Sequence, residues 1–286
     1  MKSLSIDGAT IQYHVEGQGE PLLLLHGYPQ NHRCWRHQVE AFRKDYQVIT
    51  PDWFGWGDSE RNFGIKPRYD LEVDRLKQFI NALNLDQFNF AAHDYGGYLA
   101  LGYAVENTKK IKRLAILNSR AHQCFTPFFY LQTYILCCMA RNFITRPMMN
   151  RFSMYSIHKR AMKKYVQNGS FNTDQLEEYL IWLKSSEGKH WITNFYRYYD
   201  VKTHPTVDGN LSKIICPTAI IWGKQDPYCN VEIGKSLSEK IRNSTLNIIE
   251  EADHYVMEEA PAQVNKALRL WLEPSISNST LLPLTL

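Results

Sequence analysis

Asp94, in the run Ala92-His93-Asp94-Tyr95-Gly96-Gly97, is the residue best placed to do chemistry. An apolar segment, 88–92, precedes this run and a helix-like segment, 98–105, follows it. The pattern predicts a strand, a sharp turn and a helix, with Asp94 at the apex as a nucleophile. A carboxylate that attacks an acyl carbon forms a labile anhydride, whereas attack on a saturated carbon forms an ester. Strained ethers and carbon–halogen bonds are therefore the favoured substrates.

Two downstream residues could complete this chemistry. Hydrolysis of an ester on Asp94 needs a base that activates water and a partner that holds the base in one tautomer. Asp226 follows the apolar segment 218–222, and His254 follows the apolar segment 246–249. The order nucleophile, acid, histidine, with each residue after a predicted strand, predicts a catalytic triad.

A third loop, His26-Gly27-Tyr28-Pro29, follows the apolar run 22–25. Its Tyr28 backbone N–H could pair with the Tyr95 backbone N–H as an oxyanion hole. Attack on a saturated carbon does not need such a site, but hydrolysis of the ester passes through an oxyanion on Asp94. Each donor of this kind is typically worth ~10² to 10³ in rate. A tight structural turn is the alternative interpretation of this loop.

The elements that must position these residues alternate between strand and helix. An N-terminal hairpin is predicted over 4–15, and helical patterns such as 71–83 and 232–241 separate the later strands. The alternation predicts an α/β fold with a mainly parallel eight-stranded sheet and helices on both faces. Six continuous apolar runs supply the buried strands: 22–25, 47–50, 88–92, 114–117, 218–222 and 246–249.

This alternation stops after Leu117, where a helical, aromatic-rich pattern begins. We expect a helical cap, residues 120–210, inserted between the sixth and seventh strands. It would cover the strand ends, where open α/β sheets place their sites. The predicted core is then 1–119 and 211–274, and residues 275–286 are a C-terminal tail.

With these motifs the chain resembles the aspartate-nucleophile branch of the α/β-hydrolase superfamily. That branch contains epoxide hydrolases, haloalkane dehalogenases and haloacetate dehalogenases. The resemblance covers about residues 21–108 and 214–272 and is looser in the cap. It implies the α/β-hydrolase fold, the triad Asp94, Asp226 and His254, and neither a metal nor an organic cofactor.

The subfamilies differ in the groups that stabilise the leaving group. Haloalkane dehalogenases use Trp and Asn donors for halide, and haloacetate dehalogenases use two arginines for the substrate carboxylate. This chain has Tyr28, Tyr95 and Tyr98 at the corresponding positions. An epoxide leaves a basic alkoxide that needs a proton, and a phenol, whose ordinary pKa is about 10, can supply one.

The resemblance to epoxide hydrolases implies two proton-donating cap tyrosines. Asn194-Phe195-Tyr196-Arg197 matches the segment that carries one of them. Tyr130 is the nearest match for the other, and Tyr134, one turn later, is its alternative. Aromatic filling of the cap core is the competing interpretation. Four further residues are expected to line an apolar substrate pocket: Tyr134, Trp53, Phe129 and Trp191.

Two departures leave the subfamily open. Tyr95 stands where epoxide hydrolases usually have Trp, and residues 26–31 resemble the HGFPQN of haloacetate dehalogenases. The sequence predicts a hydrolase that converts a small apolar epoxide and water into a vicinal diol. A haloalkane or haloacetate dehalogenase with the same triad is the alternative. A ligand-binding member of the fold without catalysis is a further one.

The composition and charge of the chain limit the classes of partner that it can be expected to bind. A net charge of +4 over 286 residues, with charges spread along the chain, gives no electrostatic footprint for nucleic acid. The N-terminus lacks an apolar leader and no segment is long enough to span a membrane, so a cytoplasmic monomer or homodimer is expected. Weak contact with a membrane surface is a second interpretation of a basic stretch in the cap, beside a solvated helix face: Arg141, Arg146, Arg151, Lys159, Arg160, Lys163 and Lys164.

Overall fold

The computed structural model describes residues 1–121, 125–149 and 151–273. Its strands form one eight-stranded sheet in the order β1-β2-β4-β3-β5-β6-β7-β8. The hairpin β1–β2 and the pair β2–β4 are antiparallel, and the other neighbours run parallel. The predicted mainly parallel sheet is confirmed. The strands are β1 (Lys2–Ile6), β2 (Ala9–Glu16), β3 (Glu20–Leu25), β4 (Tyr46–Asp52), β5 (Phe88–His93), β6 (Ile111–Leu117), β7 (Thr218–Gly223) and β8 (Ser244–Ile249).

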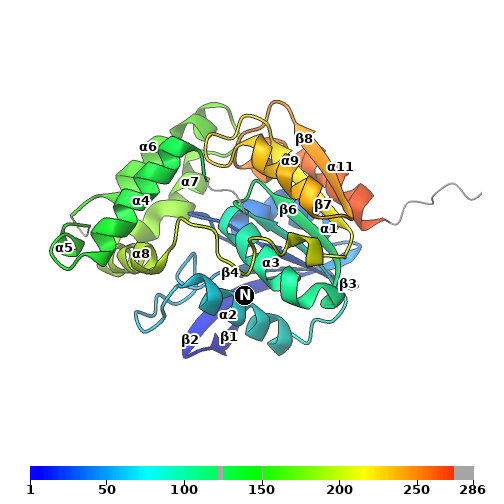
Figure 1. The fold of residues 1–286 in the computed structure, drawn as a ribbon, viewed down its shortest axis with the longest axis horizontal. Coiled ribbons are helices and arrows are strands. Elements are labelled where there is room, and N and C mark those ends of the chain that lie inside the picture. Colours follow the sequence, from blue (N-terminus) through cyan, green and yellow to red (C-terminus); the bar gives the residue numbers. More distant parts are fainter. Residues whose placement is uncertain (122–124, 150, 274–286) are drawn as a thin grey trace, which may run out of the picture.

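Helices cover both faces of the sheet (Figure 1). Helices α1 and α11 lie on one face, and α2, α3 and α9 lie on the other. All six residues of β5 are buried, because this central strand is covered on both sides, and four of the six are apolar. The core helices are α1 (Arg36–Phe42), α2 (Tyr69–Ala82), α3 (Asp94–Asn107), α9 (Val231–Lys240), α10 (Val256–Glu259) and α11 (Pro261–Leu272).

Five helices lie between β6 and β7 and gather at one side of the sheet (Figure 1). We propose the division expected from the sequence, with residues 120–210 as a cap on the core 1–119 and 211–274. The expected tail, 275–286, lies outside the described residues. Within the described ranges, no helix combines the length and the apolar character that a membrane crossing requires. The cap helices are α4 (Pro127–Arg141), α5 (Arg146–Met149), α6 (Met154–Gln167), α7 (Thr173–Leu180) and α8 (Ser186–Tyr198).

Short 3-10 turns complete the described elements. Two of them belong to the core loops, His32–Trp35 before α1 and Thr108–Lys110 after α3. Ile181–Lys184 joins α7 to α8, and Leu211–Lys213 precedes β7. These turns connect elements without adding a layer.

A buried arginine connects the end of β6 to the chain that leaves the cap. The Arg120 guanidinium is fully buried and donates hydrogen bonds to the Tyr199 hydroxyl and to the carbonyls of Asp200, Val201 and Lys202. It also lies over the Tyr98 ring, 4.4 Å from the centroid. A buried charge is costly unless polar groups surround it, and here carbonyl oxygens and aromatic rings do so.

A second polar connection lies between the cap and the core. The buried Glu258 carboxylate of α10 accepts hydrogen bonds from Gln30, from Arg36 (2.6 Å) and from the Tyr179 hydroxyl of α7 (2.8 Å). Burial raises the pKa of Glu258 to about 7, against the lowering effect of Arg36. Cap helix α7 is thereby tied to the loop that follows β3.

Candidate active site

The structure places Asp94 at the apex of a sharp turn between β5 and α3. Its backbone φ is +46°, in the left-handed region that residues other than glycine rarely adopt. Two glycines make room for this turn. A Cβ on Gly27 would lie 2.4 Å from the Asp94 Cβ, and one on Gly96 would lie 2.3 Å from the His26 carbonyl oxygen. The small residues of the motif therefore allow the tight turn and the close approach of the neighbouring loop.

Asp94, Asp226 and His254 come together at the carboxyl ends of their strands. The His254 Nδ1 donates a hydrogen bond to the Asp226 Oδ2 (2.7 Å). The His254 Nε2 faces the Asp94 Oδ1 at 4.0 Å, which is too long for a direct hydrogen bond. All three side chains are buried. This spacing leaves Nε2 available to a water molecule beside the Asp94 carboxyl group.

Asp226 is held by four donors, and one of them is a side chain that the sequence did not reveal. Its Oδ1 accepts from the backbone N–H groups of Tyr228 (2.7 Å) and Cys229 (2.9 Å), and its Oδ2 accepts from the Asn118 Nδ2 (2.8 Å) as well as from His254. Asn118 stands directly after β6. A polar residue at the end of a buried strand is the same signal that indicated Asp226, and it could have found Asn118.

The charges of the three residues depend on one another. Burial raises the pKa of Asp94, although His254 and main-chain hydrogen bonds from Tyr95 and Tyr28 act in the opposite direction. Burial also lowers the pKa of His254, but the Asp226 carboxylate outweighs this effect, and together with Asp94 it raises that pKa to about 9. The Asp226 carboxylate therefore favours the protonated form of His254 in the resting site.

The loop after β3 supplies a main-chain donor to the nucleophile. The Tyr28 backbone N–H donates to the Asp94 Oδ2 at 2.8 Å. Tyr95 contributes a second main-chain hydrogen bond to the same carboxylate. The structure thus brings together the two donors that the sequence indicated for an oxyanion.

A cavity of about 450 Å³ lies above Asp94 and His254. Cap helices α4 and α6 supply most of its upper wall. Aliphatic and aromatic side chains dominate the lining, which includes no Lys, Arg, Trp or Asn among the residues that the structure describes. The lining residues are Tyr28, Pro29, Asp94, Tyr95, Phe125, Phe129, Gln132, Thr133, Ile135, Leu136, Met154, Ile157, His158, Ala161, Met162, Phe195, Tyr196, Tyr199, Tyr228, His254 and Tyr255.

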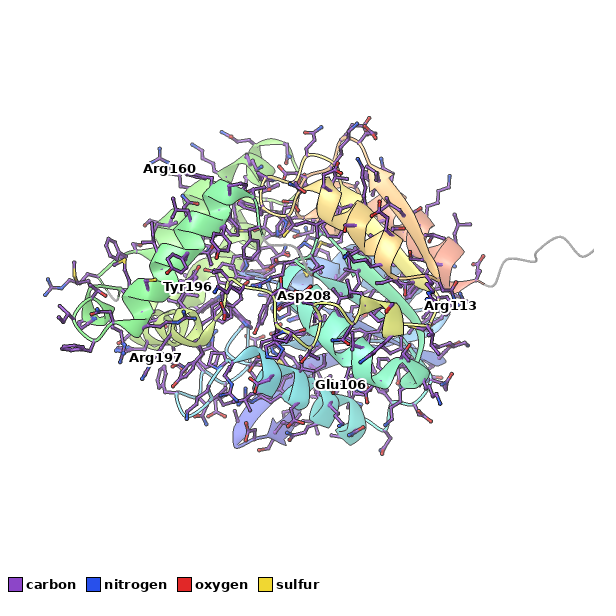
Figure 2. All side chains as sticks on the ribbon, in the orientation of Figure 1. Glu106, Arg113, Arg160, Tyr196, Arg197 and Asp208 are labelled. Atoms are coloured by element: carbon purple, nitrogen blue, oxygen red, sulfur yellow. The ribbon has the colours of Figure 1, made fainter. Side chains whose placement is uncertain are left out.

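Two phenols meet beside the nucleophile inside this cavity. The Tyr196 hydroxyl, from α8, donates a hydrogen bond to the Tyr28 hydroxyl at 3.1 Å. Burial raises the pKa of both phenols above the ordinary value. Figure 2 shows Tyr196 in the interior between cap and core. Both groups are therefore neutral proton donors at physiological pH.

Known proteins with similar sequences and folds agree with this architecture. The family model for the alpha/beta hydrolase fold matches residues 20–136. The (E)-2-((N-methylformamido)methylene)succinate hydrolase of Acinetobacter baylyi is 29% identical over 92% of this chain and 94% of its own. Epoxide hydrolase 2 of Caenorhabditis elegans is 27% identical over 92% of this chain and 77% of its own. A crystal structure of Bacillus megaterium epoxide hydrolase with an inhibitor matches at a TM-score of 0.76 and 22% identity, over 95% of this chain and 99% of that chain.

The chain has the alpha/beta hydrolase fold. Its sequence relatives include epoxide hydrolases, and the chain is a hydrolase that resembles them.

Tyr130 and Tyr134 of the hydrolase do not line the cavity, contrary to expectation. Helix α4 turns Phe129, Thr133 and Leu136 towards it. Tyr130 lies one residue after Phe129, about 100° further around the helix. It stacks on Tyr134, with ring centroids 6.3 Å apart, and Tyr134 is 45% exposed. The sequence identified the segment that forms α4, but it did not determine which side of this helix faces the cavity.

Trp53 and Trp191 also lie outside the cavity lining of the hydrolase, whereas Phe129 lines it as predicted. The buried Trp53 indole donates to Glu72 in the core. Trp191 packs against the backbone of Gly55, where a Cβ would lie 1.8 Å from the indole. Both indoles fill interior space around the loop after β4, which is the ordinary role of large aromatic residues.

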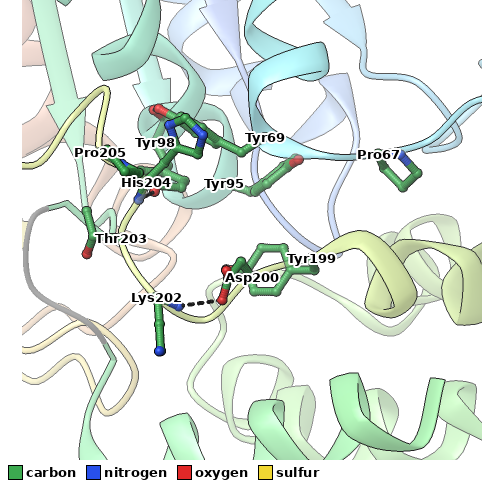
Figure 3. Close-up of a pocket in the computed structure, with 10 residues that line it drawn as sticks. All are labelled: Pro67, Tyr69, Tyr95, Tyr98, Tyr199, Asp200, Lys202, Thr203, His204 and Pro205. Carbon is green, nitrogen blue, oxygen red and sulfur yellow. Dashed lines mark hydrogen bonds between the residues drawn. The ribbon is translucent and has the colours of Figure 1, made fainter. Parts of the chain in front are cut away.

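A second, smaller cavity has a volume of about 60 Å³ (Figure 3). Tyr95 and Tyr199 line both cavities and separate them. On its other side lie Tyr98, His204 and Lys202, and the Lys202 backbone N–H donates to the Asp200 Oδ1 at 3.0 Å. The volume suffices for a few water molecules next to the active site.

One group of described residues combines side chains that can bind metals. Ligand atoms of Asp226, Cys229 and His254 lie within 4.8 Å of one another. Both Asp226 oxygens and the His254 Nδ1 already participate in hydrogen bonds that orient the imidazole. This group therefore serves as a hydrogen-bond network.

Proposed function

We propose that this hydrolase converts an apolar epoxide and water into a vicinal diol through a covalent ester on Asp94. The observation that carries the proposal is the position of the Asp94 carboxylate, which faces one apolar cavity together with His254 and a pair of neutral phenols. The nucleophile can then attack an epoxide carbon while the phenols protonate the epoxide oxygen, and the base can activate the water that cleaves the ester.

In the first step an Asp94 carboxylate oxygen forms a bond to an epoxide carbon, and the bond from that carbon to the epoxide oxygen breaks. The oxygen takes a proton from the phenol pair, and the resting imidazolium of His254 can restore that proton. The products are an ester on Asp94 with a neighbouring hydroxyl group, and neutral His254.

The second step uses the change in charge. Once Asp94 is an ester, its negative charge no longer raises the pKa of His254. Neutral His254 takes a proton from water, whose oxygen adds to the carbonyl carbon of the ester. The main-chain N–H groups of Tyr28 and Tyr95 stabilise the oxyanion. The intermediate collapses to the diol and the Asp94 carboxylate, and the proton of the carboxyl group passes to the departing alkoxide.

The cavity lining favours an epoxide over the dehalogenase substrates. Halide sites of the expected kind need indole or amide donors from Trp or Asn, and a haloacetate needs a cation for its carboxylate. The described lining residues include no Trp, Asn, Lys or Arg; their one side-chain amide is Gln132, and the imidazole of His254 is already paired with Asp226. An alkoxide needs a proton, and Tyr28 and Tyr196 can provide it.

The His254→Gln variant tests the ester. Without the base, the first turnover should leave the substrate attached, so we expect intact-protein mass to rise by one whole epoxide molecule per chain, located on Asp94 by peptide mapping. Wild-type protein under the same conditions should show no lasting adduct. Incubation with haloalkanes and haloacetates is the parallel experiment. An adduct formed only with loss of hydrogen halide would contradict the proposal, as would none with any epoxide.

We further propose that Tyr28 takes the role first assigned to Tyr130. The Tyr28 hydroxyl accepts a hydrogen bond from Tyr196, so its own proton can point to the substrate oxygen. Its pKa is raised by burial first and then by Tyr196, which keeps the proton on the phenol until an alkoxide forms. The donor pair then consists of one tyrosine from the core and one from the cap.

Phenylalanine variants should separate these tyrosines. In the His254→Gln background, Tyr28→Phe and Tyr196→Phe should each slow adduct formation by about 10²-fold, a usual size for a general acid. Tyr28→Phe keeps the backbone N–H that contacts Asp94. Tyr130→Phe is the matched control and should change the rate little. Equal slowing by Tyr130→Phe, or none by Tyr28→Phe, would show that the donor pair is wrong. Single-turnover mass spectrometry measures each rate.

A further inference from the structure

Exposed apolar side chains concentrate on one part of the cap. Nine of the fourteen exposed large hydrophobic residues among the described residues fall within 128–157. Phe143 is 78% exposed, Phe128 is 72% and Ile144 is 66%. Concentrations of this kind mark interaction surfaces rather than ordinary surface. We call this set the docking face: Phe128, Leu131, Tyr134, Ile135, Phe143, Ile144, Met148, Phe152 and Ile157.

The docking face follows one path over the cap. Phe128, Leu131 and Ile135 lie along one side of α4, because residues three and four apart share a helix face. Phe143, Ile144 and Met148 continue it onto α5 and the turn before it. Figure 1 shows α5 at the tip of the cap, at the end of the molecule away from α11.

The chain segment that carries the docking face has charges of one sign. Residues 121–173 contain seven Lys or Arg and no Asp or Glu. Lys159 pairs with Glu177 and Lys164 pairs with Asp253. In the described part of the chain no carboxylate pairs with the other five, and Figure 2 shows Arg160 extended outward from α6. These five cations are Arg141, Arg146, Arg151, Arg160 and Lys163.

We infer that the docking face binds the surface of an anionic lipid bilayer. Apolar side chains would enter the boundary between headgroups and acyl chains, and the flanking cations would contact lipid phosphates and carboxylates. A second copy of the chain fits poorly, because it would bring like charges together without any acid to compensate them. The face therefore suits an acidic surface that also accepts apolar groups.

The docking face and the cavity share two exposed residues. Ile135 of α4 and Ile157 of α6 belong both to the docking face and to the cavity lining. A protein seated on this face would present its cavity to the lipid. If the proposed function holds, its substrate class is then an apolar epoxide dissolved in the membrane, which would enter between α4 and α6 without crossing water.

Vesicle flotation tests the binding. We expect wild-type protein to float with mixed phosphatidylcholine–phosphatidylserine vesicles and much less with pure phosphatidylcholine vesicles, and salt should weaken the binding. The pair Phe143→Ser and Ile144→Ser should lower it at least about tenfold. Reversal of Arg151, Arg160 and Lys163 to Glu should lower it by about a hundredfold, at roughly fivefold per cation.

Matched controls lie away from the cap. Leu270→Ser changes an apolar residue that is 67% exposed on α11, and reversal of Lys213, Lys240 and Arg242 changes the same number of charges on the core. Neither control should alter flotation. The inference is wrong if the controls weaken binding as much as the cap variants, if anionic vesicles bind no protein at low salt, or if the wild type is a dimer that the tip variant breaks.

Turnover of a short, water-soluble epoxide separates this inference from the proposed function. The tip and charge variants leave Asp94, His254 and both phenols intact, so they should keep this activity while losing flotation. Flotation without any epoxide turnover would retain the docking face and reject the proposed function. Turnover without flotation would support the proposed function and reject the docking face.

Discussion

The Asp94→Asn variant is expected to lose turnover by about 10⁴- to 10⁶-fold, the loss typical of removing a covalent nucleophile. The amide has almost the same shape but cannot displace an epoxide oxygen. Asn also tolerates the left-handed backbone at this position, where φ is +46°. Steady-state kinetics with a chromogenic epoxide would measure the loss, and intact mass would verify that residue 94 remains an amide.

Stability gives this experiment its internal control. Asp94 is buried and its pKa is raised by that burial, so the ionised carboxylate costs folding free energy. Asp94→Asn should therefore melt at the same temperature as wild type or higher. Asp86→Asn, at an exposed loop position, should leave both activity and melting unchanged. Retained activity in Asp94→Asn would exclude the ester mechanism.

The Asp226→Asn variant should lose about 10⁴-fold in the hydrolysis step, as triads do when the acid becomes an amide and the histidine takes the wrong tautomer. The first step depends less on Asp226, because Asp94 attacks without a base. The variant should therefore accumulate the ester. Rapid-quench mass spectrometry would follow its formation and decay separately.

The pH dependence of the remaining activity has a definite sign. Asp226 is the largest cause that raises the pKa of His254, so its loss lowers that pKa below the present value of about 9. Neutral His254, the active base, then prevails at lower pH. Ester decay in Asp226→Asn should reach its plateau at lower pH than in wild type. Equal loss in both steps, with no shift, would assign Asp226 a purely structural role.

Much of the fold and the triad could be predicted from the sequence because their signals are local. Continuous apolar runs mark strands that are buried on both faces, and the polar residue after each run marks a strand end. Asp94, Asp226 and His254 all carry this signal, and their side chains are within reach of one another in the structure. Asn118 carries it too, but one amide after a strand is a weak signal without its partner Asp226.

The cap was harder to predict because its contacts depend on helix rotation and on distant partners. Tyr130 and Phe129 are neighbours in the sequence, yet only Phe129 faces the cavity. Tyr28 was assigned a role for its backbone alone, since the hydroxyl that it meets belongs to Tyr196, 168 residues later. The hydrophobic periodicity of a sequence does not indicate a contact between two residues so far apart in the chain. Trp53 and Trp191 show the same limit, because apolar character does not distinguish a pocket wall from filled core.

The buried Arg120 guanidinium has a consequence for how this molecule unfolds. The guanidinium lies over the Tyr98 ring of the core helix α3 and donates hydrogen bonds to the segment that follows α8 in the cap. The cap therefore cannot unfold around an intact core without leaving this charge buried and without its hydrogen-bond partners. Heating should therefore give a single cooperative transition for cap and core together. A cap grafted from a relative would need to supply carbonyl groups that accept hydrogen bonds from this arginine.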